Sequence, residues 1–190
     1  MISCLAIETT ANLNKPCDPP VVGVRPVFYM GFLHQLAGVG RKAGDKKIIT
    51  DLTLKPGKKL TKIEGYKTSN NFSLSSNATD YGMYLPHTGI FTVFDQTSAG
   101  LSQVDILAGI DNAFIITKMN GLLGNWRVLG INTGLATTAV GAGFNEPTGG
   151  AANVTMVAQY ERTTMEIFQH ITGVLDDTDS YLAGLAYADV

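Results

Sequence analysis

Charged side chains are scarce in this chain of 190 residues. Only 16% of the residues are Asp, Glu, Lys or Arg, whereas about 25% is usual for a soluble domain. The formal net charge is −2, so no overall positive field exists to attract nucleic acid. Hydrophobic residues make up 45%, and there are 21 glycines. This composition excludes a disordered chain, a coiled coil and a collagen, and it suits a folded domain that covers part of its surface with partner subunits.

Cysteines and long apolar runs are also few. Cys4 and Cys17 are too few for a disulfide scaffold, and their spacing matches no zinc motif. The first residues contain no basic segment followed by an apolar core, so we expect no signal peptide. No stretch approaches the roughly 18 apolar residues of a membrane helix. The sequence therefore predicts a protein that is made in a cytoplasm and has no membrane partner.

Catalytic and metal-binding motifs are missing as well. The sequence contains no G-x-S-x-G elbow, no H-E-x-x-H and no Walker A loop. The three histidines, His34, His87 and His170, have no partner at ligand spacing. The densest carboxylate group, residues 176–179, lacks the glycine and terminal glutamate of a calcium-binding EF-hand loop. We therefore expect no enzyme, no cofactor and no metal site.

Stretches rich in β-branched and aromatic residues recur along the chain. In residues 153–161 apolar and polar side chains alternate, which is typical of a strand with one buried face. Pro56-Gly57 is typical of a type II turn, and Asn120-Gly121 of a hairpin turn, because both turns need positive φ. The sequence predicts strands at residues 21–32, 48–54, 60–74, 88–94, 113–119, 126–131, 153–161 and 163–171, with loops at 37–47, 75–86 and 133–150.

One helix is expected to begin near Ser98. Either Ser98 or Ser102 can cap it, and Asp105 stands three positions after Ser102, as in a capping box. With the strands, this helix predicts a mainly β fold: an antiparallel β-sandwich or barrel of about seven or eight strands with one flanking α-helix. We expect an N-terminal arm, the sandwich domain, and an acidic, then apolar C-terminal tail, over residues 1–20, 21–171 and 172–190.

Charge is divided between segments of the chain. Residues 41–67, called here the basic segment and expected to form a hairpin, contain nine Lys or Arg and three acidic residues, for a net charge of +6. Residues 68–190 contain three basic and eleven acidic residues, for a net charge of −8. Either the basic segment of one subunit docks on the acidic surface of the next, or its charges are solvated or neutralised within one subunit. The candidate subunit contacts are Lys46, Lys47, Lys58, Lys59 and Lys62 in the basic segment and Asp176, Asp177 and Asp179 in the tail.

Several stretches of the sequence share a pattern with a known family. Residues 106–121 combine the end of the expected helix with a strand and the Asn-Gly turn. Residues 126–135 begin with tryptophan and continue as leucine-Gly-x-x-x-Gly, and residues 153–161 form the final alternating strand. The arm with Cys4 and Cys17 is similar to the start of the family. Over about half of its length the chain resembles small virion proteins of the tail-tube type from phages and prophages of Bacteroidetes.

The resemblance implies a structural role without catalytic residues. Tail-tube subunits are β-sandwiches with a flanking helix and a long hairpin, closed into stacked hexameric rings. We therefore expect homo-oligomeric rings, with other tail or neck proteins as partners and DNA only as non-specific passing cargo. Acidic residues after position 67 can line the channel and repel phosphate. The expected location is the virion, assembled in the host bacterial cytoplasm.

Other functions remain open. The near alternative is a head–tail connector of the neck ring, or a capsid-decoration subunit. The alternative from another class is a small β-sandwich module that binds a carbohydrate or a peptide. Assembly separates these classes, because a binding module stays small. If the basic segment docks on an adjacent ring, charge reversal at Lys58 and Lys59 is expected to weaken stacking.

Overall fold

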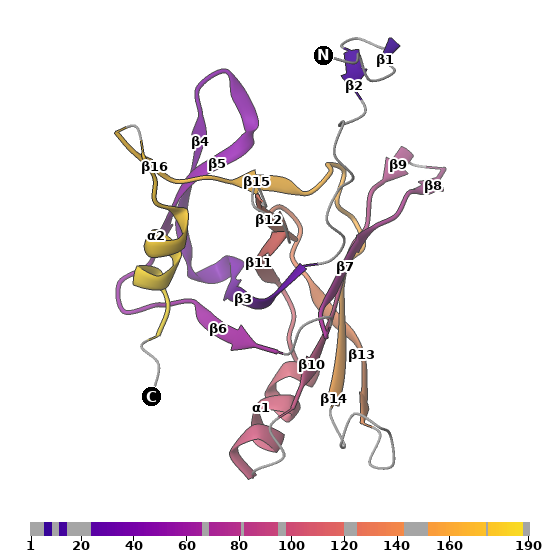
Figure 1. Ribbon diagram of the computed structural model, residues 1–190. Coiled ribbons are helices and arrows are strands. Elements are labelled where there is room, and N and C mark those ends of the chain that lie inside the picture. The colour runs from indigo at the N-terminus through magenta and orange to yellow at the C-terminus, as the bar shows by residue number, and fades with distance from the viewer. Residues whose placement is uncertain are drawn as a thin grey trace.

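The computed structural model describes residues 6–8, 12–14, 24–65, 69–80, 82–94, 98–119, 125–142, 152–173 and 175–187. Within these ranges two sheets pack face to face and two helices flank them (Figure 1). The predicted mainly β sandwich is confirmed. Cys4, Cys17, the Asn120-Gly121 turn and most of the expected arm lie outside the described residues.

Seven strands form the larger sheet. Each pair of neighbours is antiparallel except β5 and β15, which are parallel. A 3₁₀ turn, Leu33–Gln35, joins β3 to β4, although these strands lie far apart in the sheet. The spatial order is β4 (Leu36–Lys42), β5 (Asp45–Leu54), β15 (Glu166–Phe168), β12 (Trp126–Leu129), β11 (Ala113–Met119), β3 (Val24–Phe32) and β6 (Thr61–Glu64).

Four antiparallel strands form the smaller sheet. Their order is β13 (Ala136–Ala142), β14 (Ala152–Ala158), β10 (His87–Val93) and β7 (Asn71–Leu74). The other described strands form three two-stranded ladders. These are β1 (Ala6–Glu8) with β2 (Asn12–Asn14), β8 (Asn77–Thr79) with β9 (Gly82–Tyr84), and β16 (Ile171–Thr172) with β17 (Leu175–Asp176).

The main core lies between the two sheets. Phe28 and Ile115 of the larger sheet pack with Phe91 and Met156 of the smaller one, and all four are fully buried. The rings of Phe28 and Phe91 have centroids 4.9 Å apart. Helix α1 (Ser98–Ala108) closes one end of this core with Leu107. The helix predicted near Ser98 is thereby confirmed.

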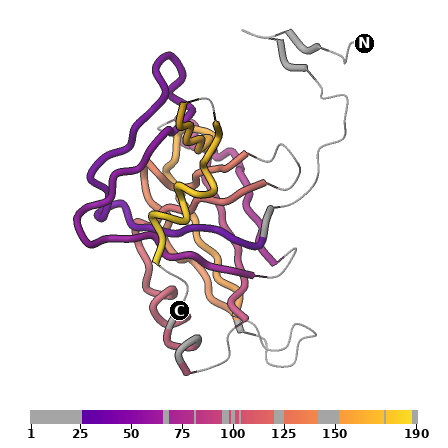
Figure 2. The backbone as a smooth tube through the Cα atoms, turned by 60° about the vertical axis from the view of Figure 1, so that its left-hand side comes forward, coloured from indigo at the N-terminus to yellow at the C-terminus, as the bar shows by residue number. Residues whose placement is uncertain are grey.

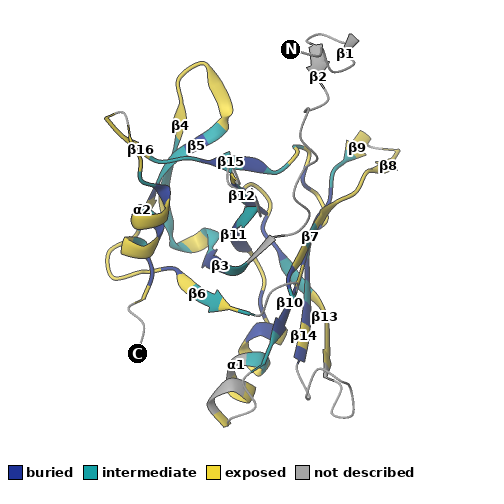
Figure 3. Ribbon diagram, in the orientation of Figure 1, coloured by how far each residue is buried: buried dark blue, intermediate teal, exposed yellow. Residues whose placement is uncertain are grey.

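A second core covers the opposite face of the larger sheet. Helix α2 (Thr178–Leu185) lies against this face and buries Leu182 completely (Figures 1 and 2). In β11, Phe114 and Ile116 belong to this second core, whereas Ile115 faces the first. A strand buried on both faces is apolar throughout instead of alternating. Figure 3 shows the resulting contrast between the buried centre of the larger sheet and the exposed tip of the β4–β5 hairpin.

Several predicted loops and the predicted tail contain regular structure instead. Residues 37–47 lie mostly in β4 and β5, residues 75–86 contain β8 and β9, and residues 133–150 contain β13. The tail contains α2. Glycine and alanine have low strand propensity, so edge strands such as β13 are formed by pairing with a neighbour and not by local preference. Because α2 is short, its stability comes mainly from burying Leu182, which a local pattern does not predict.

The basic segment does not fold as one hairpin. The Pro56-Gly57 turn is confirmed, since the Lys58 N–H donates to the Lys55 carbonyl at 3.0 Å and Gly57 has φ of +73°. However, β5 pairs with β4 and β15, whereas β6 pairs with β3. The expected single strand at 60–74 is divided between β6 and β7, which belong to different sheets. This division adds one strand to the prediction, and β4 and β13 replace predicted loops. The two main sheets therefore contain eleven strands among the described residues, not the predicted seven or eight.

Candidate functional site

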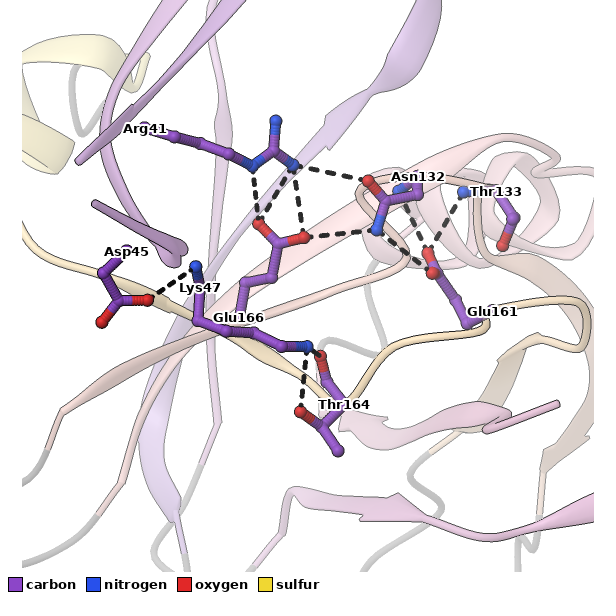
Figure 4. Close-up of polar contacts among 8 residues, drawn as sticks. All are labelled: Arg41, Asp45, Lys47, Asn132, Thr133, Glu161, Thr164 and Glu166. Atoms are coloured by element: carbon purple, nitrogen blue, oxygen red, sulfur yellow. Dashed lines mark hydrogen bonds and ion pairs between the residues drawn. The ribbon is translucent and has the colours of Figure 1, made fainter. Parts of the chain in front are cut away.

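The most elaborate polar site of the described residues joins three distant parts of the chain (Figure 4). We call Arg41, Asn132, Thr133, Glu161 and Glu166 the carboxylate cluster. Arg41 comes from β4, Asn132 and Thr133 from the turn between β12 and β13, and the two glutamates from the segment between β14 and β15 and the start of β15. Both carboxylates are almost fully buried, so they need compensating partners.

Glu166 is 5% exposed and faces the guanidinium of Arg41. The Arg41 Nε donates to Oε2 at 3.2 Å, and Nη2 donates to Oε2 at 3.0 Å and to Oε1 at 3.2 Å. The Asn132 Nδ2 donates to Oε1 at 3.3 Å. Forked pairing is a strong geometry between arginine and a carboxylate, and it ties the turn end of the β4–β5 hairpin to β15.

Glu161 is 1% exposed and binds the turn after β12. Its Oε1 accepts the backbone N–H groups of Asn132 at 3.0 Å and Thr133 at 3.1 Å, and its Oε2 accepts the Asn132 side-chain amide at 3.2 Å. The turn starts at Gly130, which has φ of +68°. A Cβ at Gly130 would lie 2.6 Å from the Leu135 side chain, so both conformation and space require glycine there.

His87 lies beside this cluster and is 1% exposed. Its Nδ1 accepts the Gly130 N–H at 3.2 Å, which places the ring proton on Nε2, 2.8 Å from the Thr163 carbonyl. Burial lowers the pKa of His87, although the hydrogen bond to Thr163 and the charge of Glu161 act in the opposite direction. The imidazole is therefore neutral and holds two backbone segments together.

The hydrogen bonds of the carboxylate cluster connect segments of the chain and leave no buried carboxylate oxygen directed at a substrate site. The oxygens of Glu161 and Glu166 accept hydrogen bonds from their own chain, and both nitrogens of His87 are engaged. A general base needs a proton of the substrate within reach, and these groups are buried under protein atoms. Among the described residues, no group of three His, Cys, Asp or Glu side chains is placed to hold a metal ion.

The lysines predicted as subunit contacts lie in three different parts of the larger sheet and its turns. Lys46 and Lys47 lie at the start of β5, where the Lys47 Nζ donates to the Thr164 carbonyl at 3.3 Å and hydroxyl at 3.2 Å. Lys58 and Lys59 are exposed on the turn that follows the other end of β5, and neither forms an ion pair within the described residues. Lys62 lies on β6 and pairs with Glu64 at 2.7 Å. The structure thus divides these cations between the two ends of β5 and the edge strand β6.

The aspartates proposed as contacts are engaged within their own chain. Asp176 accepts the Thr178 hydroxyl at 2.7 Å, a bond that lowers the pKa of Asp176. Asp177 lies 2.7 Å from the His170 Nδ1, and that bond is the main reason why the pKa of Asp177 is lowered. Asp179 pairs with Lys118 at 2.6 Å. All three lie at or near the start of α2, where the helix dipole favours negative charge.

Sequence reasoning did not find the carboxylate cluster. Arg41 and Glu166 are 125 positions apart, and no local pattern joins them. One signal was present: residues 130–134 read Gly-x-x-x-Gly, a turn that requires positive φ, and Gly130 and Gly134 both have it. Such a turn exposes backbone N–H groups that need an acceptor, and Glu161 ends the alternating strand nearby.

Comparison of the chain with protein-family models, curated proteins and solved structures finds no match. Neither helix of the described residues has the length and apolar character needed to cross a membrane. Function therefore has to be argued from the geometry of the protein itself.

Proposed function

We propose that this protein is a structural subunit of a virion, of the tail-tube type, whose smaller sheets join edge to edge in a ring around a DNA channel. The proposal rests on one observation: both edges of the smaller sheet are uncharged. β13 and β7 contain no Asp, Glu, Lys or Arg and no proline. Proteins usually protect such edges with charge or proline, because an open edge pairs with other chains.

The larger sheet provides the internal comparison. Its edge strand β4 ends with Arg41 and Lys42, and its other edge, β6, carries Lys62 and Glu64. These charges make pairing with a further strand costly. β13 has one irregularity, a register shift between Thr137 and Ala139, and its following residues pair regularly with β14. Contact of β13 with β7 of the next subunit is head to tail, a geometry that gives a ring when the rotation between neighbouring subunits closes.

The outer face of the smaller sheet fits a channel wall, but not the negative wall expected from the sequence. β7, β10, β13 and β14 contain no acidic residue at all. Since Phe91 and Val154 face the core, the alternate positions face outward, and these carry hydroxyl, amide and aliphatic groups. A wall without cations has no fixed charge to bind phosphate, so DNA can pass without being held.

Ring stacking is assigned to the exposed lysines at the Pro56-Gly57 turn. Lys58 and Lys59 are free of ion pairs within the described residues and are available to an acidic surface of an adjacent ring. The aspartates around α2 are weaker candidates for that surface, because each already binds a partner in its own chain. Opposite charges across an interface set its register and the rate of assembly.

The direct experiment is negative-stain electron microscopy with the particle mass measured on the same sample. Rings or tubes with a central hole are expected for the wild type. Ala139→Lys places a charge on the exposed outer side of β13 and is expected to give folded monomers. Thr61→Lys on β6 is the matched control and is expected to assemble normally. A wild type that stays monomeric at all concentrations would contradict self-assembly.

Charge complementation identifies the partner edge. Ala139 and Asn71 lie in one row across the smaller sheet, because Ala139 pairs with Thr155, Thr155 with Ile90 and Ile90 with Asn71. If β13 meets β7, Asn71→Glu combined with Ala139→Lys restores assembly, whereas Asn71→Lys combined with Ala139→Lys does not. Equal behaviour of the two double variants would exclude this pairing, even if rings form by another contact.

One surface feature favours a binding module as the second candidate. Tyr160 is 63% exposed, its ring lies 5.8 Å from that of Tyr84, and Arg162 lies 5.3 Å from the Tyr84 ring. Exposed tyrosine and arginine are frequent at binding hot spots. A monodisperse monomer that binds a sugar or peptide, and loses binding in Tyr160→Ala, would favour this function over assembly.

A further inference from the structure

A cavity of about 250 Å³ lies between the two sheets, separate from the carboxylate cluster. Its walls are mainly apolar, from the strand β7 of the smaller sheet, the end of β11 and the segment before β15. Three polar side chains interrupt these walls: Thr164, whose hydroxyl accepts the Lys47 Nζ, and the neighbours Thr117 and Arg127. The residues that matter are Phe72, Leu74, Met119, Met165, Thr117 and Arg127.

Thr117 and Arg127 occupy positions where the alternation of the strands predicts apolar residues. Ile115, Thr117 and Met119 share one face of β11, and Ile115 belongs to the core between the sheets. Arg127 of β12 pairs directly with Thr117, just as Leu129 pairs with Ile115. A hydroxyl and a guanidinium therefore stand side by side facing the other sheet, where continuation of the core would require aliphatic side chains.

Neither polar group has a hydrogen-bond partner among the residues that the structure describes. Thr117 is 0% exposed, and its Oγ1 has no hydrogen-bond partner. Arg127 is half-buried, and its guanidinium has no hydrogen bond or ion pair among the described residues. The other two arginines with described side chains are engaged, Arg41 with Glu166 and Arg162 with Tyr84. Buried polar groups are nearly always paired, so an orphan hydroxyl beside an unpaired cation indicates a missing acceptor.

We propose that this cavity binds an organic monocarboxylate with a short apolar body. A carboxylate matches the fork of Arg127 in a bidentate pair and can also accept the Thr117 hydroxyl. The apolar body then contacts Phe72, Leu74 and Met165. Inorganic phosphate fits less well, because it would lose its hydration against apolar walls without enough donors to replace the water. The site does not depend on how the protein assembles.

Calorimetric titration with octanoate tests the site directly. Octanoate is expected to bind saturably with one site per chain. Acetate carries the head group only and 1-octanol the apolar body only, and each is expected to bind at least about tenfold more weakly. Equal affinity for octanoate and 1-octanol would overturn the assignment of Arg127, and no saturable binding of octanoate would overturn the proposal.

Variants separate the head-group contacts from folding. Arg127→Met keeps an unbranched apolar stem and removes the charged fork, and octanoate affinity is expected to fall at least about tenfold. Thr117→Val removes the orphan hydroxyl with almost the same shape, so affinity falls several-fold while the melting temperature stays equal or rises. Lys55→Met, at the exposed end of the turn after β5 and outside the cavity, is the control and leaves affinity unchanged. If Arg127→Met does not fold, unchanged octanoate affinity in Thr117→Val still counts against the site.

Discussion

The two sheets of this protein differ in which faces and edge strands they expose to solvent. The larger sheet is buried on both faces at its centre and carries charged residues on both edge strands. The smaller sheet buries one face, exposes the other, and has no charged residue on any strand. The larger sheet therefore supplies most of the stability, whereas the smaller one offers surface and edges to a neighbour.

The expected effects of substitution follow from this difference. Changes in the larger sheet should lower the free energy of unfolding, because its side chains have no room to relax. Changes on the outer face of the smaller sheet should leave folding intact and alter association.

Phe114→Ala should be the most damaging. The ring is fully buried in the second core and packs on Gly31 so closely that a Cβ there would lie 2.6 Å from it. Truncation leaves a cavity and is expected to cost about 3–5 kcal/mol of unfolding free energy, measured by urea denaturation. Thr88→Ala, on the outward side of β10, is the control and should change it by less than about 0.5 kcal/mol. Similar losses for both would remove the distinction between the sheets.

Glu161→Gln should have the next largest effect. The amide cannot accept from both backbone N–H groups of the Asn132 turn and from the Asn132 side chain as the carboxylate does. We expect a loss of about 1–3 kcal/mol, visible as a lower urea midpoint. Glu64→Gln is the control: its pair with Lys62 is exposed, and such pairs contribute about 0–1 kcal/mol. An unchanged urea midpoint in Glu161→Gln would show that the hydrogen bonds of this carboxylate to the Asn132 turn do not stabilise the fold.

The loss of stability at acidic pH reports the lowered pKa of the buried His87. Because burial lowers its pKa in the folded protein, the unfolded chain takes up a proton first as pH falls below the ordinary value of 6.5. Stability is therefore complete above 6.5 and declines as pH falls towards the lowered folded pKa. His87→Gln should flatten this part of the curve, measured as melting temperature against pH. Asp177 acts in a different window, below its ordinary value of 3.8, because its pKa is also lowered.

Short stretches of the sequence were enough to predict α1, β14 and the Pro56-Gly57 turn. The helical period predicted α1, although Ser102, one of the two predicted caps, lies inside the helix and donates its hydroxyl to the Ser98 carbonyl at 2.9 Å. Strict alternation predicted β14, whose buried and exposed positions follow it. The Pro56-Gly57 turn was also predicted, but its partner strand was not, since a turn does not specify which strand its continuation joins. β6 pairs with β3 because Phe28 and Met30 are buried there, a contact that no turn motif encodes.

The missed features depend on distant parts of the chain. β13 has few strand-forming residues and is ordered by pairing with β14, and α2 is ordered by the hydrophobic face that it covers. In the carboxylate cluster, Arg41 and Glu166 are brought together by the parallel pairing of β5 with β15, which joins segments far apart in the sequence. The tail aspartates predicted as subunit contacts each have a partner within the chain, Thr178, His170 and Lys118 in turn, of which only Thr178 is close in sequence to its aspartate.

The smallest predicted effect concerns how α2 is held on the larger sheet. Asp179 is largely exposed, and its pair with Lys118 of β11 is accessible to solvent and salt. Asp179→Asn is expected to lower the unfolding free energy by at most about 1 kcal/mol, and the loss should shrink as salt is added. Leu182→Ala on the same helix is the matched comparison, with an expected cost of about 2–5 kcal/mol that salt does not reduce. If Asp179→Asn cost as much as Leu182→Ala, then charge and not burial would secure α2, and the stability of the larger sheet would not rest on its buried side chains alone.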